Sequence, residues 1–231
     1  MKRKLGTITI GQSPRIDVVP EMIEYLGENV EVIETGALDG LTYEQILEFS
    51  PKEDDYVLVS RLSDGRSVKI AERCIIPRLQ QCIDYLEKEG VDVILFICTG
   101  AFPEVFVSNK PIIYPQKILH SITPNLINNG KLAVITPDKD QIVQSKIRWE
   151  ETGVDVLVVP ASPYAEEEQL SNAILELRDK DYNMIVMDCI GYNMKMKETV
   201  SSSLEKPVIL ARTMVARIIG EILDKGTGED H

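Results

Sequence analysis

Two apolar stretches decide the fold: residues 94–102, with the sequence ILFICTGAF, and residues 185–193, with the sequence IVMDCIGYN. Each is an almost unbroken apolar run that leads into a cysteine, Cys98 or Cys189, and then into a turn that contains glycine. Short runs of this kind, bounded by turn residues, are typical of strands buried on both faces of a parallel sheet. The sequence therefore predicts two buried strands, each with a cysteine at its carboxyl end.

Outward from these stretches, short β-branched segments alternate with longer segments of helical period, which favours an α/β fold with parallel sheets covered by helices. The expected strands are 4–10, 30–35, 56–62, 91–98, 131–136, 154–160, 183–189 and 207–211. The expected helices are 15–26, 43–49, 73–89, 116–128, 139–151, 166–180, 193–204 and 213–225. The Ser63-Asp64-Gly65 segment interrupts two β-rich runs and predicts a hairpin.

An irregular stretch with Pro111 and Pro115 follows Phe102, and it marks the connection between two lobes. We expect a first α/β lobe at residues 1–110 and a second at 111–205. The final segment, 206–231, could pack on either lobe, and we assign it to the first.

Composition excludes several classes of function. The 231 residues carry a net charge of −12 with no basic cluster, so nucleic acid is not an expected partner. No apolar stretch reaches the roughly 18 to 20 residues of a membrane helix, and the first 15 residues do not resemble a signal peptide, so we expect a cytoplasmic protein without a membrane partner. A homodimer is the default expectation because symmetric dimers are the commonest oligomers.

Metal and cofactor sites are not expected either. The four cysteines form no CxxC pair, and His120 and His231 are the two histidines, so zinc-ligand spacing is missing. The sequence has no GxGxxG, GxxxxGK[ST] or GxSxG motif. A Cys-His nucleophilic pair would need His120, which we expect on a helix surface.

The strand-end cysteines have two interpretations. Ligands of open α/β sheets gather at the carboxyl ends of strands, where a nearby helix N-terminus can lower the pKa of a thiol. Alternatively, Cys98 and Cys189 are small apolar residues that complete buried strands. Cys74 and Cys82 lie in a helical pattern, so we interpret both as structural.

Hydroxyl and guanidinium groups at other predicted strand ends are candidates for holding a small anion. They are Ser13, Arg15, Arg61, Thr136, Ser162 and Arg212. Each also has a structural interpretation: Ser13 as the N-cap of the helix that Pro14 begins, Thr136 as part of a turn, and the arginines as solvated charges.

Two thiols without a histidine suggest acid/base chemistry. One thiolate would remove a proton from a carbon beside a carboxyl or carbonyl group, and the other thiol would protonate the opposite face. Backbone amides of Thr99, Gly100, Ile190 and Gly191 would stabilise the developing negative charge. This chemistry needs no cofactor.

The motifs TITIGQSPR, RLSDG, CTGAF and DCIGY, in this order along nearly the whole chain, resemble the AroM family, which is similar to the aspartate/glutamate racemase superfamily. The resemblance implies two Rossmann-like lobes with parallel sheets and pseudo-twofold symmetry, and a cofactor-independent active site in the cleft between them. It also implies one cysteine from each lobe, Cys98 and Cys189.

The superfamily includes amino-acid and hydantoin racemases, maleate isomerases and arylmalonate decarboxylases. The segments Thr99-Gly100 and Ile190-Gly191 depart from the residues common in that superfamily. The TIGQSPR loop also replaces the acidic-Ser-Gly-type first loop of the glutamate racemases, so the resemblance disfavours a plain glutamate racemase. The leading hypothesis is a racemase or isomerase of a small carboxylate-bearing molecule. The alternatives are an enzyme with a cysteine nucleophile, similar to maleate isomerases, and a binding or regulatory protein without turnover.

Overall fold

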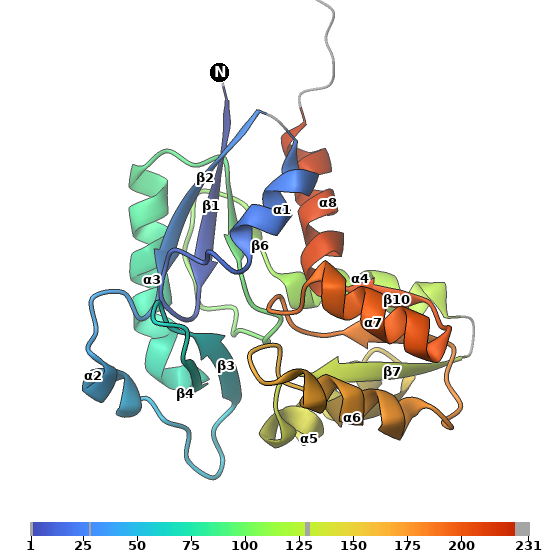
Figure 1. Cartoon of the computed structure of the whole chain (residues 1–231). Helices are drawn as coiled ribbons and strands as arrows, with labels where there is room; N and C mark the ends of the chain where they lie inside the picture. The colour runs from blue at the N-terminus through green and yellow to red at the C-terminus, as the bar shows by residue number, and fades with distance from the viewer. Residues whose placement is uncertain (1, 28, 128–129, 225–231) are drawn as a thin grey trace, which may run out of the picture.

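The computed structural model describes residues 2–27, 29–127 and 130–224, which form an α/β fold with two four-stranded parallel sheets (Figure 1). The first sheet has the order β2 (Val30–Gly36), β1 (Arg3–Thr9), β5 (Val93–Phe96) and β6 (Ile112–Ile113). The second has the order β8 (Asp155–Pro160), β7 (Lys131–Thr136), β9 (Met184–Met187) and β10 (Val208–Leu210). The expected α/β class is confirmed, and β6 is a strand that the sequence did not predict.

The two sheets have the same internal order. In each lobe the first strand, β1 or β7, lies between the second strand and the strand that leads to the cysteine, and a short edge strand follows. This shared topology is the pseudo-twofold relationship between the lobes, and it makes β5 and β9 equivalent.

Helices flank both sheets, and their positions in the chain agree with the expected ones to within a few residues. They are α1 (Val19–Leu26), α2 (Tyr43–Leu47), α3 (Glu72–Lys88), α4 (Pro115–Leu126), α5 (Ile142–Glu150) after a 3₁₀ turn (Lys139–Gln141), α6 (Glu167–Leu177), α7 (Met194–Leu204) and α8 (Ala211–Leu223). Helix α1 begins later than expected. None of the helices in the described ranges is long and apolar enough to cross a bilayer.

The last two described elements, β10 and α8, join both lobes. Strand β10 pairs with β9 in the second sheet, whereas α8 lies beside α1 of the first lobe (Figure 1). Strand β6 lies beyond residue 110 yet pairs with β5 in the first sheet. The expected lobe boundaries remain a prediction, and residues 225–231 of the expected tail lie outside the described residues.

The two lobes share a hydrophobic core. One cluster of buried side chains contains Leu5 and Leu95 from the first sheet, Val134 and Val186 from the second, and Val215 from α8. Burial of such side chains stabilises each by about 1.5–3 kcal/mol. The lobes are therefore held together on the side where α8 packs.

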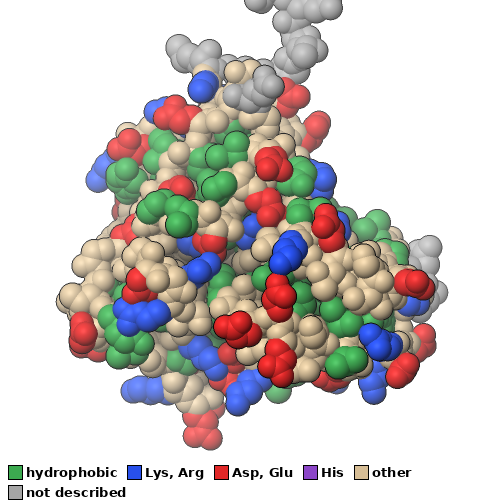
Figure 2. All heavy atoms as spheres, in the orientation of Figure 1, with side chains coloured by type: hydrophobic (Ala, Val, Ile, Leu, Met, Phe, Trp, Pro, Cys, Tyr) green, Lys and Arg blue, Asp and Glu red, His purple; other side chains and the backbone are tan. Residues whose placement is uncertain are grey.

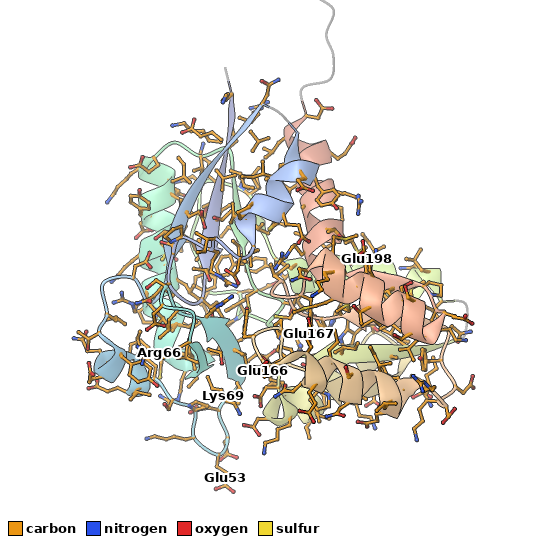
Figure 3. The ribbon with its side chains drawn as sticks, viewed as in Figure 1. Glu53, Arg66, Lys69, Glu166, Glu167 and Glu198 are labelled. Atoms are coloured by element: carbon orange, nitrogen blue, oxygen red, sulfur yellow. The ribbon has the colours of Figure 1, made fainter. Side chains whose placement is uncertain are left out.

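The hairpin of β3 (Val57–Arg61) and β4 (Ser67–Ala71) confirms the predicted turn at 63–65. It extends toward the second lobe and contacts it through polar groups (Figure 3). Lys69 pairs with Asp138 at 2.8 Å and with Asp140 at 2.6 Å, and the Val57 N–H donates to Gln144 Oε1 at 3.1 Å. The face of the molecule shown in Figure 2 carries interspersed acidic and basic side chains.

Candidate active site

The two cysteines occupy equivalent places at the carboxyl ends of β5 and β9. Cys98 lies two residues after the last residue of β5, and Cys189 lies two residues after the last residue of β9. In each turn the backbone N–H two residues further on donates to the sulfur: Gly100 to Cys98 at 3.2 Å and Gly191 to Cys189 at 3.3 Å. The same local geometry therefore surrounds both thiols.

Both cysteines line one narrow cavity between the lobes. Its volume of about 20 Å³ has room for about one water molecule. The two thiols are close enough for the charge of Cys189 to raise the pKa of Cys98. The structure thus brings the two candidate acid/base groups into one narrow site.

Burial keeps both thiols protonated at neutral pH. It raises the pKa of Cys98 to about 12 and that of Cys189 to about 11, although the glycine N–H donors oppose the shift. The sequence suggested that a strand-end thiol could have a lowered pKa, and the structure shows the opposite because desolvation outweighs the donors.

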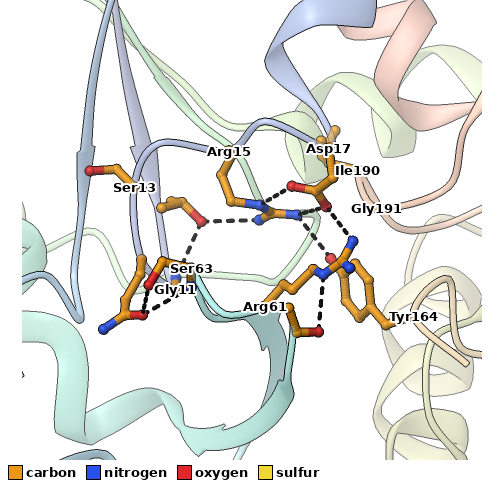
Figure 4. A network of polar contacts seen from close by, with 12 residues as sticks. Gly11, Ser13, Arg15, Asp17, Arg61, Ser63, Tyr164, Ile190 and Gly191 are labelled. Carbon is orange, nitrogen blue, oxygen red and sulfur yellow. Dashed lines mark hydrogen bonds and ion pairs between the residues drawn. The ribbon is translucent and has the colours of Figure 1, made fainter. Parts of the chain in front are cut away.

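Arg15 supplies a buried guanidinium at the first-lobe side of the cavity (Figure 4). Its Nε and Nη2 donate to the two carboxylate oxygens of Asp17 at 2.8 and 2.9 Å, and Nη1 donates to Thr9 Oγ1 at 3.1 Å. Nη2 also donates to the Tyr164 hydroxyl at 3.1 Å. Burial alone would raise the pKa of Asp17, but the bonds and charge of Arg15 lower it. Tyr164 therefore reaches across from the second lobe and closes the cavity beside Arg15.

A second ion pair among the cavity-lining residues joins Arg148, whose side chain is 12% exposed, to the buried carboxylate of Asp188. Arg148 Nη2 is 3.6 Å from Asp188 Oδ2, and the Trp149 indole N–H donates to the same oxygen at 2.9 Å. Arg148 Nη1 donates to the carbonyl of Thr99 at 2.9 Å, and Thr99 Oγ1 donates to the carbonyl of Asp188 at 3.0 Å. These bonds connect the turn after Cys98 to the second lobe.

Arg212 holds the turn after Cys189. Its Nε donates to the carbonyl of Ile190 at 2.9 Å, Nη2 to the carbonyl of Gly191 at 3.0 Å, and Nη1 to Glu21 at 3.1 Å. The side chain is 1% exposed and is not among the residues that line the cavity. Arg212 is therefore placed to position the turn.

The structure brings together most of the residues singled out in the sequence. Those that line the cavity are Cys98, Cys189, Arg15, Thr99, Gly100, Thr136, Ile190 and Gly191. Arg61 lies outside it, beside the Tyr164 ring, and Ser162 accepts the Tyr164 N–H at 3.2 Å. Ser13 is not the N-cap of α1, which is Val18; its hydroxyl donates to Asp39 at 2.5 Å.

Sequence reasoning missed six polar residues that line the cavity. They are Tyr56, Ser60, Gln141, Arg148, Tyr164 and Asp188. The position of Asp188 directly before Cys189 was a usable signal. The other five residues lie in ordinary helix, strand or turn patterns, which gave no signal that these side chains line a cavity.

His120 differs from the expectation of a helix-surface residue. Its ring packs on Trp149 with a centroid distance of 4.1 Å, and burial lowers its pKa to about 4. It is not a cavity-lining residue. Within the described ranges, no three His, Cys, Asp or Glu side chains are grouped as metal ligands.

Comparison with known proteins identifies the family. The model of the AroM protein family matches residues 5–223. The chain belongs to the AroM family. A comparison of the sequence with curated proteins returned no match.

Solved structures share the fold of this AroM-family protein at low sequence identity. Maleate isomerase from Pseudomonas putida S16 has a TM-score of 0.65 at 16% identity, covering 97% of this chain and 94% of that one. Allantoin racemase from Klebsiella pneumoniae has 0.64 at 13% identity, with 96% and 87% covered. Aspartate racemase from Picrophilus torridus has 0.63 at 12% identity, with 96% and 94% covered. The two-lobe fold is therefore that of known racemases and isomerases.

Proposed function

We propose that this AroM-family protein is a cofactor-independent racemase or isomerase that acts on a small carboxylate-bearing substrate, with Cys98 and Cys189 as the acid/base pair. One observation carries the proposal. Two thiols from equivalent strands of the two lobes line one cavity, and each accepts a glycine N–H in the same way. The racemase and isomerase titles of structures with this fold support the class of reaction.

The reaction balances with these groups alone. One cysteine, as thiolate, takes the proton from the substrate carbon beside the carboxyl group, and the electron pair of that C–H bond moves into the carboxyl group. The electron pair then returns to the same carbon and forms a new C–H bond with the proton that the other cysteine, as thiol, gives to the opposite face, so the site ends with the thiol and thiolate exchanged. Two guanidinium groups, those of Arg15 and Arg148, line the cavity, and we assign the substrate carboxylate to Arg15.

The narrow site must change before this chemistry begins. Because both thiol pKa values are raised, one thiol has to give its proton to the solvent when the substrate binds. Arg148 favours the thiolate at Cys98, and Arg15 favours it at Cys189. Because the cavity volume is about 20 Å³, we infer that the lobes separate when a substrate enters.

Hydrogen exchange tests the proposal. The protein is incubated in D₂O with racemisable small carboxylates, and deuterium at the α-carbon is measured by mass spectrometry. We expect exchange by the native chain and none by the Cys98→Ala/Cys189→Ala variant, with Cys74→Ala as a control that exchanges normally. Exchange that survives in the double variant would contradict acid/base roles for these cysteines.

A cysteine nucleophile is the second candidate. It is supported by the fold shared with a Nocardia farcinica maleate cis-trans isomerase whose structure is described as holding a covalently bound succinylcysteine intermediate. A substrate-mass adduct on Cys98 or Cys189 in intact-protein mass spectrometry would favour this reaction over proton transfer. Ligand binding without either adduct or exchange would indicate a binding protein.

A further inference from the structure

A second pocket lies beside the thiol cavity, where the loop after β1 meets the turn of the β3–β4 hairpin, and we call it the outer pocket. It is lined by residues 14–17 and by four residues of the RLSDG motif. Its volume is about 240 Å³, compared with about 20 Å³ for the thiol cavity. Arg15 lines both spaces, so the outer pocket adjoins the candidate active site.

Two sequence motifs that the proposed reaction does not use build this pocket. In TITIGQSPR, Gln12 Oε1 accepts from the N–H and the hydroxyl of Ser63 in RLSDG, at 3.0 and 2.9 Å. The Gln12 N–H donates to the carbonyl of Arg61 at 3.4 Å. A Cβ at Gly11 would collide with that carbonyl and with the Ser60 hydroxyl, so glycine permits the close approach. The walls of the outer pocket are therefore held in a fixed arrangement.

The outer pocket has a surplus of positive charge. The Arg61 side chain is 38% exposed, and its Nη1 is 3.8 Å from Asp17 Oδ2. Its Nε donates to the carbonyl of Gly65 at 3.1 Å. Asp17 also accepts two bonds from Arg15, at 2.8 and 2.9 Å, so one carboxylate serves two guanidinium groups. The Nη groups of Arg61 thus remain placed to donate to an anion that enters from solvent.

Tyr164 of the second lobe lies between the outer pocket and the thiol cavity (Figure 4). Its ring centroid is 5.8 Å from the guanidinium carbon of Arg61 and 5.9 Å from that of Arg15. Its hydroxyl accepts from Arg15 Nη2 at 3.1 Å. Movement of Tyr164 away from the first lobe would connect the two spaces, and it would free Arg15 Nη2 to bind a carboxylate.

We propose that the outer pocket is the entry site for the substrate, where Arg61 captures the carboxylate before Tyr164 withdraws and the carboxylate passes to Arg15. The inference rests on the proposed function, because it describes how the substrate of that site arrives. The ligand class is a small carboxylate, whose carbon chain can contact the apolar side chains of Ile16 and Leu62 in the same pocket. The net charge of the protein is −12, which repels anions, so a local cation at the entrance favours their arrival.

Alkylation of the cavity thiols by iodoacetamide tests the role of Tyr164 without any substrate. Cys98 and Cys189 are expected to react about fivefold faster in Tyr164→Phe, the effect of one lost hydrogen bond. In Tyr164→Ala, which also loses the contacts of the ring with both arginines, the gain is expected to be about tenfold or more. Peptide mass spectrometry measures the rate at each cysteine.

The chain supplies the controls for this experiment. Tyr85→Ala, at an exposed position of α3, should leave the rates unchanged. Cys82 is 6% exposed in the core of the first lobe, so its rate shows whether a variant has unfolded. Unchanged rates at Cys98 and Cys189 in both folded Tyr164 variants would overturn the entry route.

A comparison of iodoacetate with iodoacetamide tests the role of Arg61, because the two reagents differ little in size but only iodoacetate is an anion. The measured quantity is the ratio of the two rates at Cys98 and Cys189, divided by the same ratio at Cys74. Arg61→Gln is expected to lower it about threefold at low ionic strength, the effect of one charge about 6 Å away in water. Arg66→Gln removes the same charge from the same hairpin outside the outer pocket and should not change it. An unchanged ratio in Arg61→Gln would overturn the capture of anions by Arg61.

The labelling experiments do not depend on turnover, so they separate this inference from the proposed function. Labelling as expected in a protein that exchanges no deuterium into any small carboxylate would support the entry route and contradict the proposed function. Deuterium exchange together with unchanged labelling in the Tyr164 and Arg61 variants would overturn the entry route and leave the proposed function standing.

Discussion

Arg148, on α5 of the second lobe, donates to the carbonyl of Thr99 in the first lobe at 2.9 Å. Arg212 makes the corresponding bond to Ile190 at 2.9 Å, so in each turn an arginine holds the carbonyl directly after the cysteine. The bonds explain why the two sulfurs keep the same geometry. Both arginines therefore influence the thiols indirectly, by holding the turns in which the cysteines lie.

Replacing Arg148 by Met should weaken both the fold and the reaction. The change leaves the buried Asp188 carboxylate without its counter-charge, which costs about 3 kcal/mol of unfolding free energy, and it releases the turn after Cys98, which reduces exchange about a hundredfold. Urea unfolding and the α-proton exchange assay measure the two effects. Arg178→Met, at an exposed position, is the control, and full activity in Arg148→Met would contradict the positioning role.

The stability of the protein should fall at alkaline pH because of the two thiols. Their pKa values of about 12 and 11 in the folded state exceed the ordinary thiol value, about 8.5, which applies to the unfolded chain. The unfolded state therefore loses these protons first, so the stabilisation is complete below about pH 8.5 and is lost as the pH rises toward 11 and 12, at about 1.4 kcal/mol per pH unit for each thiol. Urea unfolding from pH 7 to 10 is compared with Cys98→Ala/Cys189→Ala. Parallel pH profiles would show that the thiols do not titrate in this way.

Gly191→Ala should displace Tyr164. A Cβ at Gly191 would lie 2.5 Å from the Tyr164 hydroxyl oxygen and 2.8 Å from Pro163 Cγ, so the side chain has to move and its bond to Arg15 is lost. Overpacking of this kind costs about 1–3 kcal/mol. In a Tyr164→Ala background the cost of Gly191→Ala should be smaller. A double-mutant cycle of unfolding free energies measures the difference, and additive costs would show that Tyr164 is not the obstacle.

Gln144→Ala should ease separation of the lobes. Gln144 holds both the N–H and the carbonyl of Val57, at 3.1 and 2.8 Å, across the interface between the hairpin and α5. We expect at least tenfold faster amide exchange at Val57, faster ligand association, and a loss of about 1 kcal/mol in stability. Gln80 holds the N–H and carbonyl of Val107 within the first lobe in the same way, so Gln80→Ala is a matched control. Equal rates of ligand association in the two variants would show that the lobes do not separate at the contact between Gln144 and Val57.

The fold was largely predictable from the sequence. Parallel strands buried on both faces produce apolar runs such as ILFICTGAF, and the helices between them show regular apolar spacing. Strand β6 has two residues and is too short to leave such a pattern. It is recognised as a strand only because it pairs with β5 in the folded sheet. The start of α1 was placed too early because Ser13-Pro14 resembles a helix start, whereas Ser13 is bound to Asp39.

The site was predictable only for residues that lie at the ends of strands, where the sheet topology brings them together. The cysteines and their neighbours lie at strand ends, so their meeting follows from the topology. Arg148, Tyr164 and Gln141 reach the cavity through packing of one lobe on the other, which no local pattern encodes. The raised thiol pKa values likewise depend on burial in the closed cavity.

The central claim is that each cysteine serves one face of the substrate carbon. The most direct measurement is deuterium exchange of each enantiomer separately, with Cys98→Ser and Cys189→Ser, on a substrate that the native chain racemises. The account predicts that each variant loses racemisation and exchanges one enantiomer only, and that the two variants retain opposite enantiomers. Retention of the same enantiomer by both variants, or of full racemisation by either, would contradict it.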